Sequence, residues 1–226
     1  MSRLEMLPFL TIFTLLCQAA SAPIQSRSMA EVLQRHVVGS NVEEETIEGA
    51  FLTAMGQARV SGGVIRRIDC KDVLTVKKLS VPDGSLRDAL DRIVERMPTY
   101  RWQADQGVVN LLAVAETPPL LDVRIARYEA ENVEYLQAAV AELEACPEVH
   151  QALSALHLTS GIRILTGPAP LKAPTPFTVR CRNVTFREAL NAIVRAHGGA
   201  VWEYKERHCD GANEFWVEFV SQWRTQ

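Results

Sequence analysis

The stretch SLRDALDRIV at residues 85–94 returns one hundred positions later as TFREALNAIV at residues 185–194. No gap is needed to align the two copies, and the same offset also relates Trp102 to Trp202. A repeat of this kind indicates that the two halves of the chain share one structural plan.

Each copy predicts a short amphipathic helix with a marked start. The hydroxyl of Ser85 or Thr185 can accept a hydrogen bond from the third helical residue, and the acid Asp88 or Glu188 can reach back to the capping N–H. Apolar residues then recur at helical spacing on one face. These residues are Leu86, Ala89, Leu90, Ile93 and Val94 in the first copy, and Phe186, Ala189, Leu190, Ile193 and Val194 in the second. We expect both helices to face a core and to carry no catalytic group.

Length and composition allow either one large domain or two small ones. The chain has 226 residues, of which 47% are hydrophobic, and this content suffices for a packed core. Its net charge of −3 provides no bulk attraction to nucleic acid or to anionic lipid. We therefore expect no nucleic-acid partner.

Residues 1–22 are typical of a signal peptide. Arg3 precedes an apolar run from Leu7 to Leu16 that is too short to span a bilayer, and a small-residue cleavage site ends at Ala22. The sequence thus predicts export through the Sec pathway and a periplasmic or secreted mature chain that starts at Pro23. We expect no membrane span in that mature chain.

Export makes disulfides permissible. Four cysteines remain after the predicted cleavage, namely Cys70, Cys146, Cys181 and Cys209. Four cysteines allow three complete pairings, and the sequence does not choose among them. Three of the four lie in the second half, which favours one bridge within that half.

The pattern of breakers divides the mature chain into two modules. Glu116 to Pro119 is the best linker candidate, because its two prolines disfavour both helix and strand. A first module then covers residues 23–115 and a second covers residues 116–226. We predict an α+β fold of two tandem small modules, each with two helices packed on short mixed β-sheets.

Several further elements follow from local patterns. In the first half these are a helical stretch within Ser26 to Asn41, a leading strand near Val37-Val38, and a hairpin of Tyr100 to Trp102 with Val108 to Val114. In the second half they are strands at 121–125 and 162–165, a helix capped by Asn132, an exposed loop at 167–176, a turn at Asn183-Val184, and a final hairpin of 200–204 with 214–220 joined by a long polar loop at 205–213.

The motif around the second helix resembles a known family. It runs from Asn183 to Leu190 and continues at Ile193-Val194, Gly198 and Trp202, and Val81 to Leu90 is a less regular copy. This pattern resembles the short N-terminal domain shared by bacterial outer-membrane secretins and TonB-dependent receptors. Two tandem copies cover nearly all of the mature chain. The resemblance implies small α+β modules that lie in the periplasm and bind proteins.

Few residues suggest catalysis or metal binding. His150 and His157 share a helical face, but metal sites on helices usually use closer spacing and a third ligand. We therefore predict no metal, no cofactor and no enzymatic activity. In the alternative, an exported enzyme, the site would use dispersed residues around His208 and Asp210.

The last strand is the best candidate for binding. Residues 215–220 are apolar on both faces, whereas a half-buried edge strand normally alternates with polar residues. Either other parts of the chain cover both faces, or the strand accepts a partner. The predicted protein-binding residues are Phe215, Trp216, Val217 and Phe219.

These observations predict an exported, non-catalytic protein-binding or adaptor module of the bacterial cell envelope. Its partner would be another envelope protein. The alternative is a self-assembling structural component of an envelope complex, in which copies of the chain associate with one another.

Overall fold

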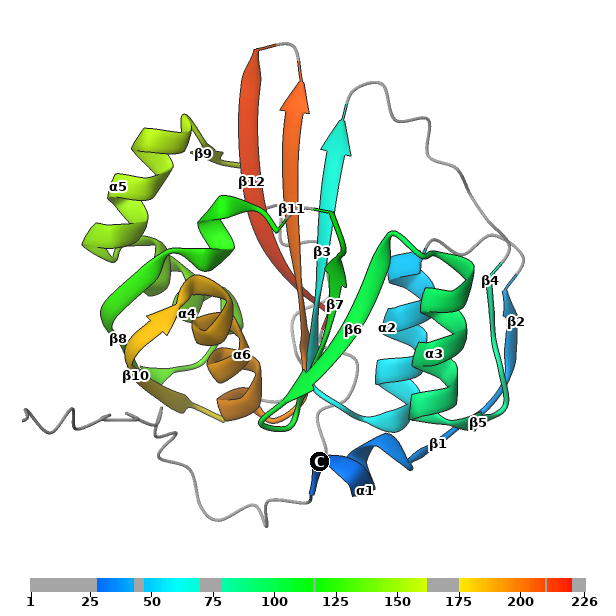
Figure 1. Cartoon of the computed structure of the whole chain (residues 1–226). Coiled ribbons are helices and arrows are strands. Elements are labelled where there is room, and N and C mark those ends of the chain that lie inside the picture. Colours follow the sequence, from blue (N-terminus) through cyan, green and yellow to red (C-terminus); the bar gives the residue numbers. More distant parts are fainter. Residues whose placement is uncertain are drawn as a thin grey trace, which may run out of the picture.

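The computed structural model describes residues 28–42, 47–69, 79–115, 117–161, 175–209 and 211–220 of the chain. A central six-stranded β-sheet lies between two layers, as Figure 1 shows. Helices α2 (Ile47–Ala58) and α3 (Leu86–Arg96) cover one face. Helices α4 (Leu136–Glu144) and α6 (Phe186–His197) cover the other. The predicted α+β class is confirmed.

The remaining elements complete the two layers and the sheets. The other helices are α1 (Met29–Leu33), α5 (Pro147–Leu156) and the 3-10 helix η1 (Pro119–Asp122). The strands are β1 (His36–Val37), β2 (Ser40–Val42), β3 (Gly62–Asp69), β4 (Leu79–Val81), β5 (Gly84–Ser85), β6 (Tyr100–Asp105), β7 (Val108–Ala113), β8 (Arg124–Val133), β9 (Thr159–Ser160), β10 (Phe177–Thr185), β11 (Val201–Cys209) and β12 (Ala212–Val220).

Both halves of the chain contribute to the central sheet. Its strand order is β6-β7-β3-β11-β12-β9. The halves meet where β3 pairs in parallel with β11, from Gly62 opposite Val201 to Asp69 opposite His208. The division into modules at residues 23–115 and 116–226 stays a prediction. If the chain is divided there, the backbone hydrogen bonds between β3 and β11 join the two modules.

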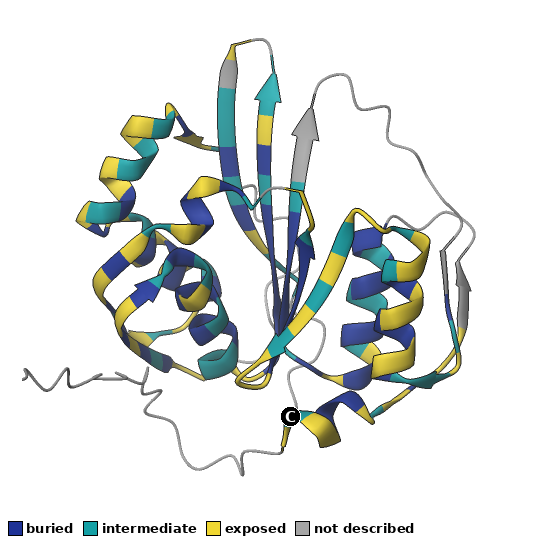
Figure 2. Cartoon of the chain, in the orientation of Figure 1, coloured by how far each residue is buried: buried dark blue, intermediate teal, exposed yellow. Residues whose placement is uncertain are grey.

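The two faces of the central sheet belong to different hydrophobic cores. We call one the α2 face; its buried residues Val64, Val109 and Val201 pack in the cluster that contains α2 and α3. We call the other the α6 face; there Ile65 and Trp202 join the cluster that contains α4 and α6. Figure 2 shows the buried residues of the helices turned toward the sheet and the exposed ones turned outward.

Small antiparallel pairs complete each half and repeat one arrangement. In the first half β1 pairs with β5, so that His36 lies opposite Ser85. In the second half β8 pairs with β10, so that Arg124 lies opposite Thr185. The first pair contains the leading strand predicted near Val37-Val38. The helical stretch predicted within Ser26 to Asn41 is correct only for α1, because β1 and β2 follow it.

The two repeated helices begin as their capping residues predict. The N–H of Asp88 donates to Ser85 Oγ at 3.2 Å, and the Asp88 carboxylate accepts from the Ser85 N–H at 3.2 Å. Hydrogen bonds from the Ser85 side chain and then its backbone lower the pKa of Asp88. The equivalent distances between Thr185 and Glu188 are 3.2 Å and 2.6 Å. The predicted apolar faces are buried, except that Val94 is only half-buried.

The linker candidate is a packed segment where the structure describes it. Pro118 is buried, and Pro119 opens η1, a position that suits a residue without an N–H. Leu120 and Leu121 are fully buried in the core of the second half. The strand expected at 121–125 therefore starts later, at Arg124, because the 3-10 turn occupies the preceding residues.

The cap predicted at Asn132 and the turn predicted at Asn183-Val184 are both wrong. Both asparagines instead have a left-handed backbone conformation within a strand. Asn132 has φ of +53° near an irregularity in the pairing of β8 with β10, and α4 begins behind Tyr135 without a side-chain cap. Asn183 has φ of +52° and lies within β10 rather than in a separate turn. Asparagine tolerates this region better than most residues.

The final hairpin is longer than predicted. β11 extends to Cys209 and β12 starts at Ala212, so only Asp210 and Gly211 join them. Gly211 has φ of +79°, as tight hairpin turns require. The long polar loop expected at 205–213 is therefore mostly strand, because polar residues on both faces of β11 find side-chain partners within the hairpin.

Some predictions fall outside the described residues. They concern the signal peptide at 1–22, Cys70, the strand at 162–165, most of the loop at 167–176, and Asp210. Among the helices of the described ranges, none combines the length and apolar character that crossing a membrane requires.

Candidate protein-binding edge

Strand β12, which contains all four predicted binding residues, is paired unequally on its two sides. On one side it pairs with β11 along its whole length. On the other side β9 pairs only with Glu214 and Phe215. The N–H of Gly161 then donates to the Phe215 carbonyl at 2.8 Å, and Gly161 is the last described residue of this segment.

A short segment of the β12 edge beyond that contact is unpaired in the described structure. Backbone groups of a strand point alternately to its two neighbours. Because the Phe215 carbonyl points toward β9, the N–H and C=O groups of Val217 and Phe219 point to the same side. No strand of the described ranges lies beside these two residues. Among the described residues these backbone groups therefore have no neighbouring strand, which is the arrangement to which a strand can be added.

On the α6 face, the side chains of β12 belong to the core. Phe215 and Val217 are 0% and 1% exposed, and Phe219 packs partly buried against the same cluster. The rings of Phe215 and Tyr204 stack with centroids 6.1 Å apart. Phe215 and Val217 thus present no side chain to a partner, and contribute to an edge only through their backbone.

On the α2 face, Trp216 lies in a row of charged residues. It stands opposite Lys205, whose Nζ is 2.7 Å from Glu218 and 3.0 Å from Glu203. Arg207 pairs with Glu214 in the same row. We call these residues, with Trp216 among them, the charged strip. Trp216 is half-buried, so part of its ring is exposed between side chains that already form ion pairs with one another.

Burial perturbs the charges of this strip. It raises the pKa of Glu203, and Lys205 only partly opposes the shift. Burial also lowers the pKa of Lys205, but hydrogen bonds to Glu218 and then Glu203 outweigh it, and the net pKa is raised. Sequence reasoning missed the strip. Its signal is the alternation of charge at 203, 205 and 207 against 214 and 218, which a hairpin brings onto one face.

The alternative catalytic region contains a buried polar network on the α6 face. The Tyr204 hydroxyl donates to Glu206 Oε2 at 2.7 Å, and His208 Nε2 lies 2.5 Å from Glu206 Oε1. His208 Nδ1 is 3.0 Å from Asn213 Oδ1. The carboxylate orients the imidazole, as buried networks do when their members satisfy one another. Sequence reasoning identified His208 but missed Glu206.

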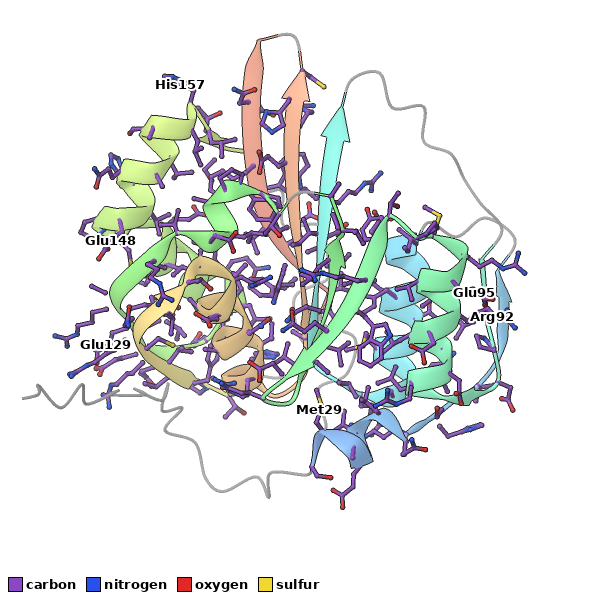
Figure 3. All side chains as sticks on the ribbon, in the orientation of Figure 1. Met29, Arg92, Glu95, Glu129, Glu148 and His157 are labelled. Atoms are coloured by element: carbon purple, nitrogen blue, oxygen red, sulfur yellow. The ribbon has the colours of Figure 1, made fainter. Side chains whose placement is uncertain are left out.

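Metal-ligand groups are not gathered in the part of the chain that the structure describes. No cluster of three His, Cys, Asp or Glu residues with metal-binding geometry occurs there. His150 and His157 are both exposed. Figure 3 shows His157 at the far end of α5, where its φ of +54° ends the helix.

One of the four cysteines that the sequence predicted as possible disulfide partners is not bonded. Cys181 and Cys209 are disulfide-bonded. Cys146 is a free, buried thiol, which corrects the prediction that it can form a bridge. It lies just before Pro147 and packs in the core of the second half, 3.6 Å from the Glu142 carbonyl, and burial raises its pKa.

Comparisons of the chain with protein-family models, with curated proteins and with solved structures find no match.

Proposed function

We propose that the protein is an exported, non-catalytic binding or adaptor module of the bacterial cell envelope. In this proposal its two halves are modules similar to the short domains of secretins and TonB-dependent receptors. The carrying observation is the edge of β12 at Val217 and Phe219, which has no neighbouring strand among the described residues and lies beside the half-buried ring of Trp216. The partner is another envelope protein that supplies an extended segment.

The chemistry of the edge favours a particular kind of segment. A strand added beside β12 gains main-chain hydrogen bonds whatever its sequence, and side-chain pockets supply specificity. Trp216 is the aromatic anchor on the α2 face, and aromatic residues often dominate binding energy. Because Lys205 already contacts Glu203 and Glu218, an apolar side chain fits beside Trp216 better than a charged one.

The experiment isolates the backbone contribution. The partner is captured from envelope extract, identified, purified and titrated against the wild-type chain, Phe219→Pro and Phe219→Ala. Both variants lose the same ring, but only proline also removes the outward N–H. We expect Phe219→Pro to bind at least tenfold more weakly than Phe219→Ala. Equal affinities of the two variants would show that no strand is added at this edge.

Export is tested separately. The mass of the chain recovered from the periplasmic fraction should correspond to a start at Pro23. A chain that keeps residues 1–22 and stays in the cytoplasm would contradict the export part of the proposal.

Self-assembly is a second candidate function. The other end of the central sheet favours it, because β6 is also an edge strand.

A further inference from the structure

Strand β6 ends the central sheet on the side away from β12. The N–H of Val114 donates to the Thr99 carbonyl at 2.8 Å, so the backbone of Thr99 points toward the β7 side. By alternation Arg101, Gln103 and Asp105 also bond to β7, and Trp102 and Ala104 point outward. The outward N–H and C=O groups of Trp102 and Ala104 face no strand in the described ranges.

The exposed side chains of β6 change from positive through neutral to negative along the strand. Arg101 and Asp105 are equally spaced on either side of Gln103, and all three are exposed on the α6 face. Within the described residues no hydrogen bond engages these three side chains, but the Asp105 carboxylate interacts electrostatically with the Arg195 guanidinium of α6. All three are exposed and can therefore contact another molecule, although Asp105 already has Arg195 as a neighbouring positive charge.

The opposite side of β6 is held rigidly. The indole N–H of Trp102 donates to Asp91 Oδ1 at 2.8 Å, and the guanidinium of Arg87 lies 5.5 Å from the ring centroid. These contacts with α3 fix the outward backbone groups of Trp102 in place. A preformed edge loses little conformational entropy when a second strand pairs with it.

We propose that two copies of this chain associate through antiparallel pairing of their β6 strands, with Gln103 on the two-fold axis. In this register Trp102 lies opposite Ala104 of the second copy, and both such pairs exchange main-chain hydrogen bonds. Arg101 lies opposite Asp105 of the second copy, and the reverse pair repeats the contact. The central sheet becomes continuous across the dimer.

Charge complementarity selects this register. It places each Arg101 opposite a carboxylate and joins the two Gln103 amides, which carry both donors and acceptors. Trp102 meets the small side chain of Ala104. Shifting the strands until Arg101 or Asp105 meets its own copy creates like-charge pairs, and a parallel in-register arrangement does so at both positions. A second copy in the antiparallel register is therefore the occupant that this edge fits.

The dimer is independent of the proposed binding edge, because β12 lies at the other end of the sheet. An occupied β6 leaves Val217 and Phe219 open. Trp216→Glu should therefore leave the dimer intact, and Arg101→Asp should leave capture of the partner intact, so the two proposals can fail separately.

The first test uses charge reversal. Sedimentation of the purified full chain over a range of concentrations should show a shift from monomer to dimer mass. Arg101→Asp and Asp105→Arg should each abolish the shift, because every ion pair becomes repulsive. An equimolar mixture of the two variants should recover the dimer, since each end then joins opposite charges. Arg96→Asp, an equal charge change at the exposed end of α3, should have no effect.

The second test determines the register of the two paired β6 strands. Opposite residues of a non-hydrogen-bonded pair have α-carbons about 4.5 Å apart, within disulfide range. Gln103→Cys should therefore give an interchain disulfide under mild oxidation. Arg101→Cys should not, because that residue and its own copy are about 14 Å apart in this register. A monomeric wild-type chain at all concentrations, a dimer that survives Arg101→Asp, a mixture that stays monomeric, or equal cross-linking by both cysteine variants would each overturn the proposal.

Discussion

The indole ring of Trp202 lies directly against the α-carbon of Gly63. A β-carbon added to Gly63 would come within 1.9 Å of Trp202 Cε2, closer than any real contact. The two residues occupy paired positions of β11 and β3, and thus belong to different halves of the chain. The junction between the halves therefore depends on a position without a side chain, where a bulky ring of one half covers the backbone of the other.

Gly63→Ala should destabilise the protein. The ring or the strand must move to admit the methyl group, and overpacking of this kind costs about 1–3 kcal/mol in the free energy of unfolding. Chemical denaturation checks the value. The matched control is Gly161→Ala, where the added carbon lies at an ordinary 3.4 Å from its nearest neighbours. Equal small effects at both glycines would mean that Trp202 is not held against β3.

Removing the hydrogen-bond acceptor of each repeated tryptophan should change the free energy of unfolding by different amounts. Trp202 Nε1 donates to Asn191 Oδ1 at 2.8 Å, as Trp102 does to Asp91 at 2.8 Å. Trp202 is fully buried, so Asn191→Ala leaves a buried donor unsatisfied and costs about 1–3 kcal/mol. Water can replace the acceptor of the half-buried Trp102, so Asp91→Ala should cost less. Unfolding curves of the two variants that shift equally would contradict this account.

The repeated leucines test the helix faces. Leu90 and Leu190 are both fully buried. Replacing either with alanine should lower the free energy of unfolding by about 2–5 kcal/mol through lost transfer energy and a cavity. Arg92→Ala is the control, because Arg92 is exposed on the outer face of α3, where it pairs with Glu95 (Figure 3), and should change stability by less than about 0.5 kcal/mol.

Neighbouring residues of β12 should respond differently to a negative charge. Phe215→Glu places an unpaired carboxylate in the core and should prevent accumulation of folded protein. Trp216→Glu adds a charge to the half-buried α2 face and should keep most of the melting temperature while weakening partner capture. Arg92→Glu, a charge change on the exposed outer face of α3, should retain capture. If Trp216→Glu also unfolds the chain, then Trp216 has a structural role.

Alkaline unfolding should depend on Tyr100. Burial, assisted by the Glu48 carboxylate, raises the pKa of Tyr100 from 10.0 to about 12. The unfolded chain therefore releases this proton first, so the stability associated with it is fully present below pH 10 and is lost as the pH rises toward 12. Stability measured by denaturation across this range should fall less in Tyr100→Phe than in the wild type. Parallel curves would exclude the contribution of this residue.

Local sequence determined the two capped helices and the turn of the β6–β7 hairpin. Ser85 and Thr185 start helices because the relevant hydrogen bonds join residues only three apart, so composition and spacing suffice to predict them. The same holds for the β6–β7 hairpin, whose turn lies at Gln106-Gly107. The periodicity of the apolar residues also indicated which side of each helix is buried, since one core stripe requires that spacing.

Only the tertiary structure decided how the halves join and which edges stay open. The pairing of β3 with β11 links residues more than a hundred positions apart, and no local pattern encodes a partner at that distance. Glu203, Lys205 and Glu218 looked like parts of a loop or an ordinary strand until the hairpin placed them side by side on one face. The sequence of β12 is apolar on both faces, and this pattern alone did not predict which face is buried. Periodicity shows which residues share a face, but not what covers that face. Phe215 and Val217 face the core and Trp216 lies among charges, because burial depends on the whole packed chain. Within the described residues, β9 pairs with only two residues of β12.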